Sequence, residues 1–233
     1  MSTKSLSALI VLSIIFFVSS AYAQNRVVVI PLGGDDLTSC SVGLCSVAGE
    51  ATLTCGSTAK QVACVVPPKL VFISSGTYSG NFGGLAGADA KCKELADAAG
   101  LPDSTYRAWL SDATGSPSTR FTQSQGTYVL TNGSVVASSY ADLTSGDRLL
   151  VAIDVDQNGA DTGEERVWTG TNRFGTPILN MENEPDSNCS DWTSTGALTY
   201  GTYGLSRETA DLDWSSAGSR ECFVPHEIYC FEQ

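Results

Sequence analysis

The sequence is poor in the residues that many catalytic and metal sites use. It has one histidine, His226, in 233 residues, and none of its eight cysteines form the Cys-x-x-Cys pair of a structural zinc site. It also lacks the Gly-x-Ser-x-Gly elbow of α/β-hydrolases and the Gly-Lys-Ser/Thr ending of a phosphate-binding loop. These absences argue against zinc, Ser-His-Asp and nucleotide chemistry, so we expect a protein that is not an enzyme.

Basic residues are also scarce. Lys and Arg number 13 against 25 Asp and Glu, which gives a formal net charge of −12. Such a surface repels the phosphates of nucleic acids and of anionic membranes, so neither is expected as a partner. The acidity suits calcium as a cofactor, or it serves solubility alone; no other cofactor is expected.

Long hydrophobic runs are limited to the N-terminus. Lys4 precedes an apolar run over Ala8–Val18, and Ala21-Tyr22-Ala23 has the small-x-small pattern of a cleavage site. The run is shorter than the roughly 20 residues that a spanning helix needs. Residues 1–23 are therefore predicted to be a signal peptide, and the chain is predicted to be secreted or extracytoplasmic without a transmembrane anchor.

The cysteines divide the rest of the chain near Pro67-Pro68. Four of them crowd into residues 24–67, and an even number in an exported chain predicts disulfides. Glu50–Cys55 and Lys60–Val66 are expected to form a hairpin. On proximity alone we predict Cys40–Cys45 and Cys55–Cys64 bridges, although a tight four-residue loop would place Cys55 opposite Lys60. This small N-terminal segment needs such cross-links.

Residues 68–233 show an α+β pattern. The spacing of apolar residues predicts one amphipathic helix over Gly87–Ala99 that ends at Gly100, with Cys92 on its buried face. The last cysteine, Cys230, is the candidate partner of Cys92. Short strands are predicted at Lys69–Ser74, Tyr106–Leu110, Thr127–Leu130, Arg148–Ile153, Arg166–Thr169 and Glu227–Phe231. A long loop region, Thr171–Ala217, separates the last two, and loops of that length are usually functional.

One segment matches the spacing of an EF-hand calcium loop. The match D-x-D-x-N-G-x5-E places its candidate ligands at Asp154, Asp156, Asn158, Ala160 and Glu165. The flanking segments are predicted strands, whereas an EF-hand has flanking helices. The segment is therefore either an isolated calcium loop or a solvated acidic hairpin turn.

Five separated runs of sequence resemble one known family. They are GNFGGLAGADAKC, AGLPDSTYRAWLSD, RVWTGT, NCSDWTS and IYCFEQ, in the order found in a bacterial endostatin-like domain family of unknown function with the C-type lectin-like fold. The resemblance covers about residues 69–233. It implies a Cys92–Cys230 bridge from the first helix to the last strand and a second bridge, Cys189–Cys222.

The resemblance also suggests a sugar site. Glu184-Pro185-Asp186 is similar to the calcium-binding triplet of sugar-binding lectins, although Cys189 follows it too soon. After Trp214 the chain has Ser215-Ser216 where lectins have the better ligands Asn-Asp. The triplet is therefore either a calcium site or a proline turn between acids. The candidate ligand-contacting residues are Glu184, Asp186, Trp192, Tyr203 and Trp214, with core packing as the alternative for the aromatic ones.

Two functions agree with these observations. The first is a non-catalytic binding module whose long loops contact an extracellular protein or glycan, as the family resemblance implies. The second is a structural or surface-associated protein in which the N-terminal segment mediates attachment or assembly.

Overall fold

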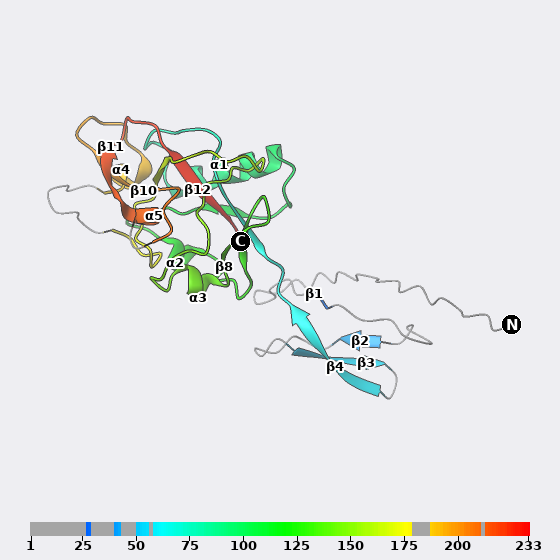
Figure 1. Ribbon diagram of the computed structural model, residues 1–233. Helices are drawn as coiled ribbons and strands as arrows, with labels where there is room; N and C mark the ends of the chain where they lie inside the picture. Colours follow the sequence, from blue (N-terminus) through cyan, green and yellow to red (C-terminus); the bar gives the residue numbers. More distant parts are fainter. Residues whose placement is uncertain (1–26, 29–39, 43–49, 56–57, 179–186, 211–212) are drawn as a thin grey trace. The chain divides into compact units, whose positions relative to one another are not determined.

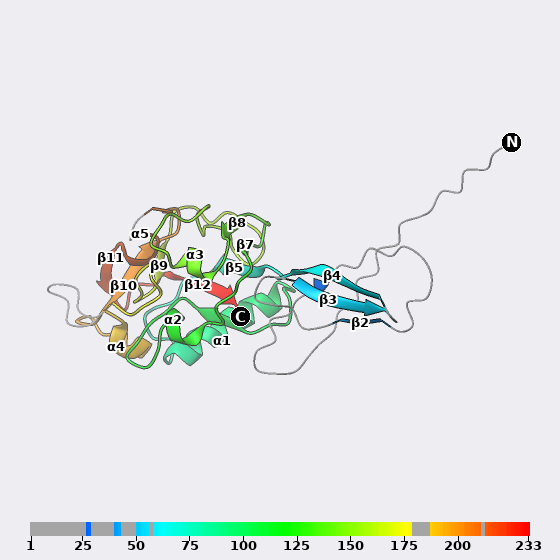
Figure 2. The same cartoon turned by 90° about the horizontal axis from the view of Figure 1, so that it is seen from below.

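In the computed structural model the chain divides into two compact units, residues 1–67 and 68–233 (Figures 1 and 2). The structure describes the backbone of residues 27–28, 40–42, 50–55, 58–178, 187–210 and 213–233, and side chains from Val66 onward within these ranges. The predicted signal peptide, residues 1–23, lies outside the described residues. Each unit has its own sheet.

The first unit contains a four-stranded sheet with the order β1-β4-β3-β2. Its strands are β1 (Val27–Val28), β2 (Cys40–Val42), β3 (Glu50–Cys55) and β4 (Thr58–Val65). The predicted hairpin is present with a shorter turn, because Cys55 lies opposite Thr58 rather than Lys60. Cys40 lies opposite Cys55, and Cys64 lies opposite Val28. This register does not place Cys55 next to Cys64. The side chains of these cysteines, and Cys45 entirely, lie outside the described part, so their pairing stays a prediction.

The second unit is α+β and is organised around its last strand, β12 (Glu227–Glu232), which is buried along its whole length. β12 pairs with β5 (Lys69–Ile73) in antiparallel fashion, and also with β9 (Arg166–Trp168) and β6 (Tyr106–Ala108). The main sheet has the order β11-β10-β9-β12-β5-β7-β8. The outer strands are β7 (Tyr128–Leu130), β8 (Val135–Ala137), β10 (Tyr200–Leu205) and β11 (Gly218–Glu221).

The two faces of this sheet carry separate hydrophobic clusters. Alternate residues of a strand point to opposite faces. Tyr229 and Phe231 of β12 accordingly pack into one cluster with Trp109 and Trp214. Ile228 and Cys230 pack into the other, against helix α1 (Leu85–Ala98). The sheet thus separates an aromatic core from a helix-covered core.

Helix α1 agrees with its predicted position and cap. Its buried residues include Ala88, Cys92 and Ala96, and Gly100 has a φ of 68° just beyond its end. The Cys92–Cys230 disulfide joins the helix to β12, and a second disulfide joins Cys189 to Cys222. In the chain-entropy model a crosslink that closes a loop of 138 residues stabilises the fold by about 4–5 kcal/mol. Two bridges of this kind are typical of an oxidising compartment.

The described part of the second unit also contains four short helical turns: α2 (Pro117–Arg120), α3 (Tyr140–Leu143), α4 (Cys189–Trp192) and α5 (Asp213–Ser216). The prediction of a strand at Arg148–Ile153 is wrong. Leu149 and Ile153 are buried in the aromatic core as their alternation suggests, but the segment forms no strand. Its Leu149 N–H donates instead to the carbonyl of Thr209. No described helix is long and apolar enough to cross a membrane.

Candidate binding surface

The long loop region is anchored by a left-handed turn at α4. Cys189, Ser190, Asp191 and Trp192 all have φ between 52° and 59°, a conformation that costs roughly 1–2 kcal/mol per non-glycine residue. The Cys189–Cys222 disulfide holds the start of the turn. At its end, the Trp192 carbonyl accepts from the N–H groups of Phe82 and Gly84. These contacts compensate for the strain and fix the turn to the segment that enters α1.

The two tryptophans of this region are core residues, which corrects their prediction as ligand contacts. Trp192 is fully buried and its Nε1–H donates to the Ser111 carbonyl at 2.8 Å. Trp214 packs against Trp109, with ring centroids 5.0 Å apart. Side chains without exposed surface cannot contact a ligand from solution. A sugar-stacking platform would need other aromatic residues.

An exposed apolar pair lies at the end of the β10–β11 hairpin. Leu198 is 87% exposed and Phe223 is 53% exposed. Tyr200 pairs with Glu221, and the Cys222 N–H donates to the Thr199 carbonyl, so Leu198 and Phe223 each lie one residue beyond the last contact between the two strands, in turns. Cys222 ties this end of the hairpin to α4. The pair is therefore carried on a rigid support.

Tyr203 is half-buried beside His226. The two ring centroids are 5.8 Å apart, and the Arg166 guanidinium lies 5.4 Å from the Tyr203 ring centroid. His226 also packs on Trp168, at 4.5 Å. Burial, and then the positive charges of Arg166 and Arg220, lower the pKa of His226 to about 4. The imidazole is therefore neutral at neutral pH. Of the predicted ligand-contacting residues with described side chains, Tyr203 alone keeps exposed surface.

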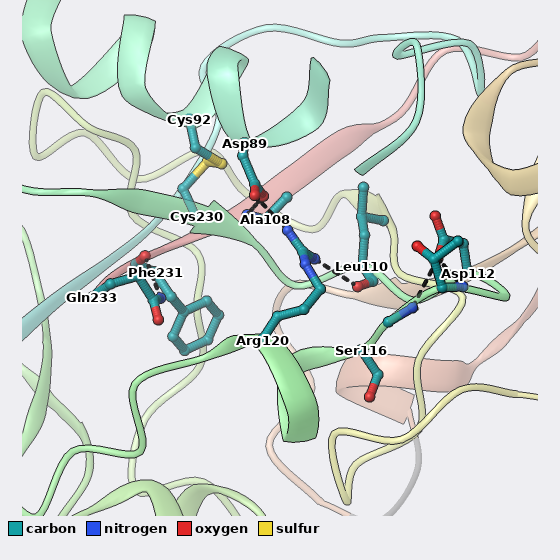
Figure 3. A network of polar contacts seen from close by, with 12 residues as sticks. Asp89, Cys92, Ala108, Leu110, Asp112, Ser116, Arg120, Cys230, Phe231 and Gln233 are labelled. Carbon is teal, nitrogen blue, oxygen red and sulfur yellow. Dashed lines mark hydrogen bonds and ion pairs between the residues drawn. A yellow bond between two sulfur atoms is a disulfide. The ribbon is translucent and has the colours of Figure 1, made fainter. Parts of the chain in front are cut away.

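A shallow depression of about 600 Å³ lies at the start of α1. Its lining includes Asp89, Arg107, Asp112, Arg120 and Asp191. Figure 3 shows that Arg120 extends from α2 toward Asp89 of α1, with which it forms an ion pair, while its Nη1 donates to the Leu110 carbonyl. The ion pair joins α2 to α1, and the hydrogen bond joins α2 to the segment that follows β6.

The carboxylates of this depression are largely engaged by the chain itself. Asp112 accepts from the backbone N–H groups of Thr114 and Gly115, at 2.6 and 3.0 Å. Asp191 accepts from the N–H of Ala113 at 3.0 Å. Backbone donors of this kind satisfy carboxylate oxygens and fix the loop. The hydrogen bond from Ala113 to Asp191 joins the segment after β6 to α4.

The EF-hand-like segment forms a turn closed by its own hydrogen bonds. Asp156 Oδ1 accepts from the N–H groups of Asn158 and Ala160, at 2.8 and 2.9 Å. Asp154 lies 3.6 Å from Nε of Arg207, which also pairs with Asp161. The N–H of Glu165 donates to the Ser206 hydroxyl, and Glu165 directly precedes strand β9 rather than a helix. Within the described ranges no group of three His, Cys, Asp or Glu side chains is placed to hold a metal ion. Calcium binding here stays a prediction.

The other predicted calcium segment, Glu184-Pro185-Asp186, lies outside the described residues. The segment Trp214-Ser215, compared above with the second calcium motif of lectins, is described, and Ser215 is buried. The Ser215 hydroxyl donates to the Thr171 carbonyl at 2.7 Å and accepts from Trp109 Nε1–H at 2.8 Å. Ser215 therefore stabilises the core through these two hydrogen bonds.

The fold and surface define an α+β, disulfide-linked unit with an exposed apolar pair beside β10 and β11. The chain belongs to DUF1554, a family of proteins of unknown function, whose pattern matches residues 75–209. The match lies within the second unit and ends before β11 and β12. The comparison with curated proteins gave no match.

Proposed function

We propose that the chain is a secreted, non-catalytic binding module of the C-type lectin-like fold, and that it recognises an extracellular protein. The observation that carries the proposal is the exposed pair Leu198 and Phe223 at the end of a disulfide-held hairpin. Single exposed apolar residues are common, but two that adjoin the same disulfide-held pair of strands offer an apolar contact surface.

A protein is favoured over a neutral glycan as the ligand. Sugars are commonly held by exposed aromatic faces and, in lectins, by calcium, but Trp192 and Trp214 are buried. Leucine and phenylalanine side chains instead gain free energy by leaving water, roughly 1.5–3 kcal/mol for each that becomes fully buried. The net charge of −12 further favours a partner whose own surface is not strongly acidic overall.

The proposal is tested by probing an array of extracellular matrix proteins and glycans with the oxidised chain, with calcium and with EDTA. We expect protein spots that do not depend on calcium. Calcium-dependent glycan spots would point instead to Asp154–Glu165 or Glu184–Asp186. A blank array in both buffers would favour the structural role and overturn the proposal.

A matched pair of variants locates the contact. The double variant Leu198→Ser/Phe223→Ser should weaken capture of the protein at least about thirtyfold, since two apolar contacts of about 1–2 kcal/mol each would be lost. The control, Leu150→Ser/Phe174→Ser, changes two residues that are similarly exposed, at 61% and 46%, outside this hairpin. Equal affinity of the two variants would show that the hairpin end is not the contact.

A further inference from the structure

Two arginines flank Tyr203 on one face of the β9–β10–β11 sheet. Tyr203 pairs with Trp168 of β9 and with Gly218 of β11. Arg166 precedes Trp168 by two residues and Arg220 follows Gly218 by two, so both share the face of Tyr203. The Arg166 guanidinium reaches over the Tyr203 ring. The absence of a side chain at Gly218 leaves room for Tyr203, whose hydroxyl lies 3.0 Å from where a Cβ would be.

These arginines are poorly compensated, although the chain is acidic. No ion pair of Arg166 occurs within the described ranges. Arg220 has one weak contact, 3.6 Å from its Nε to an oxygen of its neighbour Glu221, and its side chain is 50% exposed. An exposed pair at that distance contributes little. In a chain with 25 acidic residues, two cations without strong partners on one face are available for an external anion.

A buried polar atom lies at the same place. His226 is only 6% exposed, and its Nε2 has no hydrogen-bond partner. Its ring packs on Trp168 and Tyr203, its backbone pairs with that of Tyr78, and the charges of Arg166 and Arg220 act on its pKa. An unpartnered ring nitrogen is costly inside a protein. The imidazole stays neutral, so the free energy cost is that of an unpaired neutral group and not of a buried charge.

We propose that the Arg166–Tyr203–Arg220 face is a second recognition site, which takes a carboxylate of an acidic polypeptide segment. A guanidinium matches a carboxylate in shape and can donate two parallel hydrogen bonds to it. The Tyr203 hydroxyl, which has no partner within the described ranges, supplies a further donor. A bound carboxylate also offsets the positive potential that His226 otherwise faces.

This inference rests on the proposed function, because it names the chemistry that the protein partner must offer. A polypeptide is favoured over a free anion because the apolar pair Leu198 and Phe223 is carried by the same hairpin. An acidic segment with apolar neighbours would use both features. A sulfated sugar would satisfy the arginines alone.

The single histidine of the chain makes a direct test available, since its imidazole gives one set of ring resonances in an NMR spectrum. The oxidised chain is titrated at pH 5.0 with a hexa-aspartate peptide. Neutralising two cations should raise the pKa of His226 above its value of about 4, so the protonated fraction at pH 5.0 should rise measurably above about one tenth. Hexalysine should produce no change.

The variants Arg166→Gln and Arg220→Gln test whether hexa-aspartate binds at this site. Each removes one cation, so each should raise the protonated fraction of the free protein and weaken the response to hexa-aspartate about tenfold. Arg148→Gln, an exposed arginine outside this sheet, should behave like the wild type. A response that persists in the Arg166→Gln/Arg220→Gln double variant would place the binding elsewhere and overturn the inference.

Three further outcomes are decisive. A response to inorganic sulfate or a sulfated disaccharide, without one to hexa-aspartate, would show that the face recognises sulfate and not polypeptide. If hexa-aspartate fails while array capture still depends on Leu198 and Phe223, only this inference fails. If capture is lost throughout but hexa-aspartate still binds through the arginines, the site stands and the proposed function does not.

Discussion

His226 immediately precedes β12, and Glu227 is the first residue of that strand, yet burial moves their pKa values in opposite directions. Burial and two nearby arginines lower the pKa of His226 to about 4, whereas burial and the charge of Glu165 raise the pKa of Glu227 to about 7. Both shifts disfavour the charged form. In the unfolded chain both side chains return to their ordinary pKa values. Each residue therefore makes the free energy of unfolding depend on pH, and the two dependences have opposite signs.

His226 makes the fold sensitive to acid. Its folded pKa lies below the unfolded value of about 6.5, so its contribution is present above pH 6.5 and is lost as the pH falls toward 4. Between pH 7 and pH 4 the wild type should lose about 3 kcal/mol more than His226→Gln, which does not titrate. Urea unfolding of both chains at the two pH values measures this difference. Parallel losses in the two chains would contradict a buried neutral histidine.

Glu227 has the reverse effect. Its folded pKa lies above the unfolded value, so its contribution is complete below about pH 4.5 and is lost as the pH rises through 7. Glu227→Gln keeps the shape of the side chain without the charge. The variant should gain about 2–3 kcal/mol over the wild type between pH 4.5 and pH 8, measured by urea unfolding. An unchanged difference over that range would show that Glu227 is solvated when ionised.

At the scale of elements, β10 depends on a close approach between backbones. A Cβ on Gly204 would lie 2.0 Å from the Trp214 carbonyl oxygen of α5, which is far inside van der Waals contact. Gly204→Ala should therefore push α5 away and destabilise the second unit by about 3 kcal/mol or more. Gly76→Ala is the control, because its nearest neighbour would be 3.9 Å away and its φ is not positive. Thermal unfolding of both variants tests this, and similar midpoints would contradict it.

The same glycines explain why β10 and β11 were not predicted from the sequence. β10 reads Tyr-Gly-Thr-Tyr-Gly-Leu, and glycine is unfavourable in strands unless another group must approach closely. Gly201 lies under Cys189 Sγ and Trp168, and Gly204 lies under α5. β11, Gly-Ser-Arg-Glu, has no apolar alternation. By contrast α1, β5, β9 and β12 have strong apolar patterns, which local sequence reveals.

The candidate sites likewise combine residues that the sequence indicates with residues that only the fold brings together. Tyr203 was selected from the sequence as an aromatic residue in a long loop region, but Arg166, Arg220 and His226 come from three other segments. They meet Tyr203 only through the parallel pairing of β12 with β9 and the register of β10 with β11. Local sequence carries no signal for that pairing. The burial of Trp192 and Trp214 likewise depends on distant partners, such as Ser111 and Trp109.

At the scale of the whole molecule, residues 68–233 form a compact unit with its own core and crosslinks. Both described disulfides lie within this unit, joining Cys92 to Cys230 and Cys189 to Cys222. Both hydrophobic clusters are also internal to it. The boundary at Pro67-Pro68 lies in a segment without regular structure between β4 and β5. A fragment that starts at Pro68 therefore loses no residue of either core.

We expect this fragment to fold alone, to form both disulfides and to unfold in urea at the same midpoint as the second unit of the full chain. The reason is that both hydrophobic clusters and both described disulfides, one of them a crosslink of about 4–5 kcal/mol, are retained. Mass spectrometry of the oxidised fragment after proteolysis should identify the Cys92–Cys230 and Cys189–Cys222 peptides. The fragment should also keep the hexa-aspartate response of His226, since Arg166, Tyr203 and Arg220 all belong to it. A fragment that folds but has scrambled disulfides would show that residues 1–67 guide the pairing, and they would then have a role in folding beyond that of a separate unit.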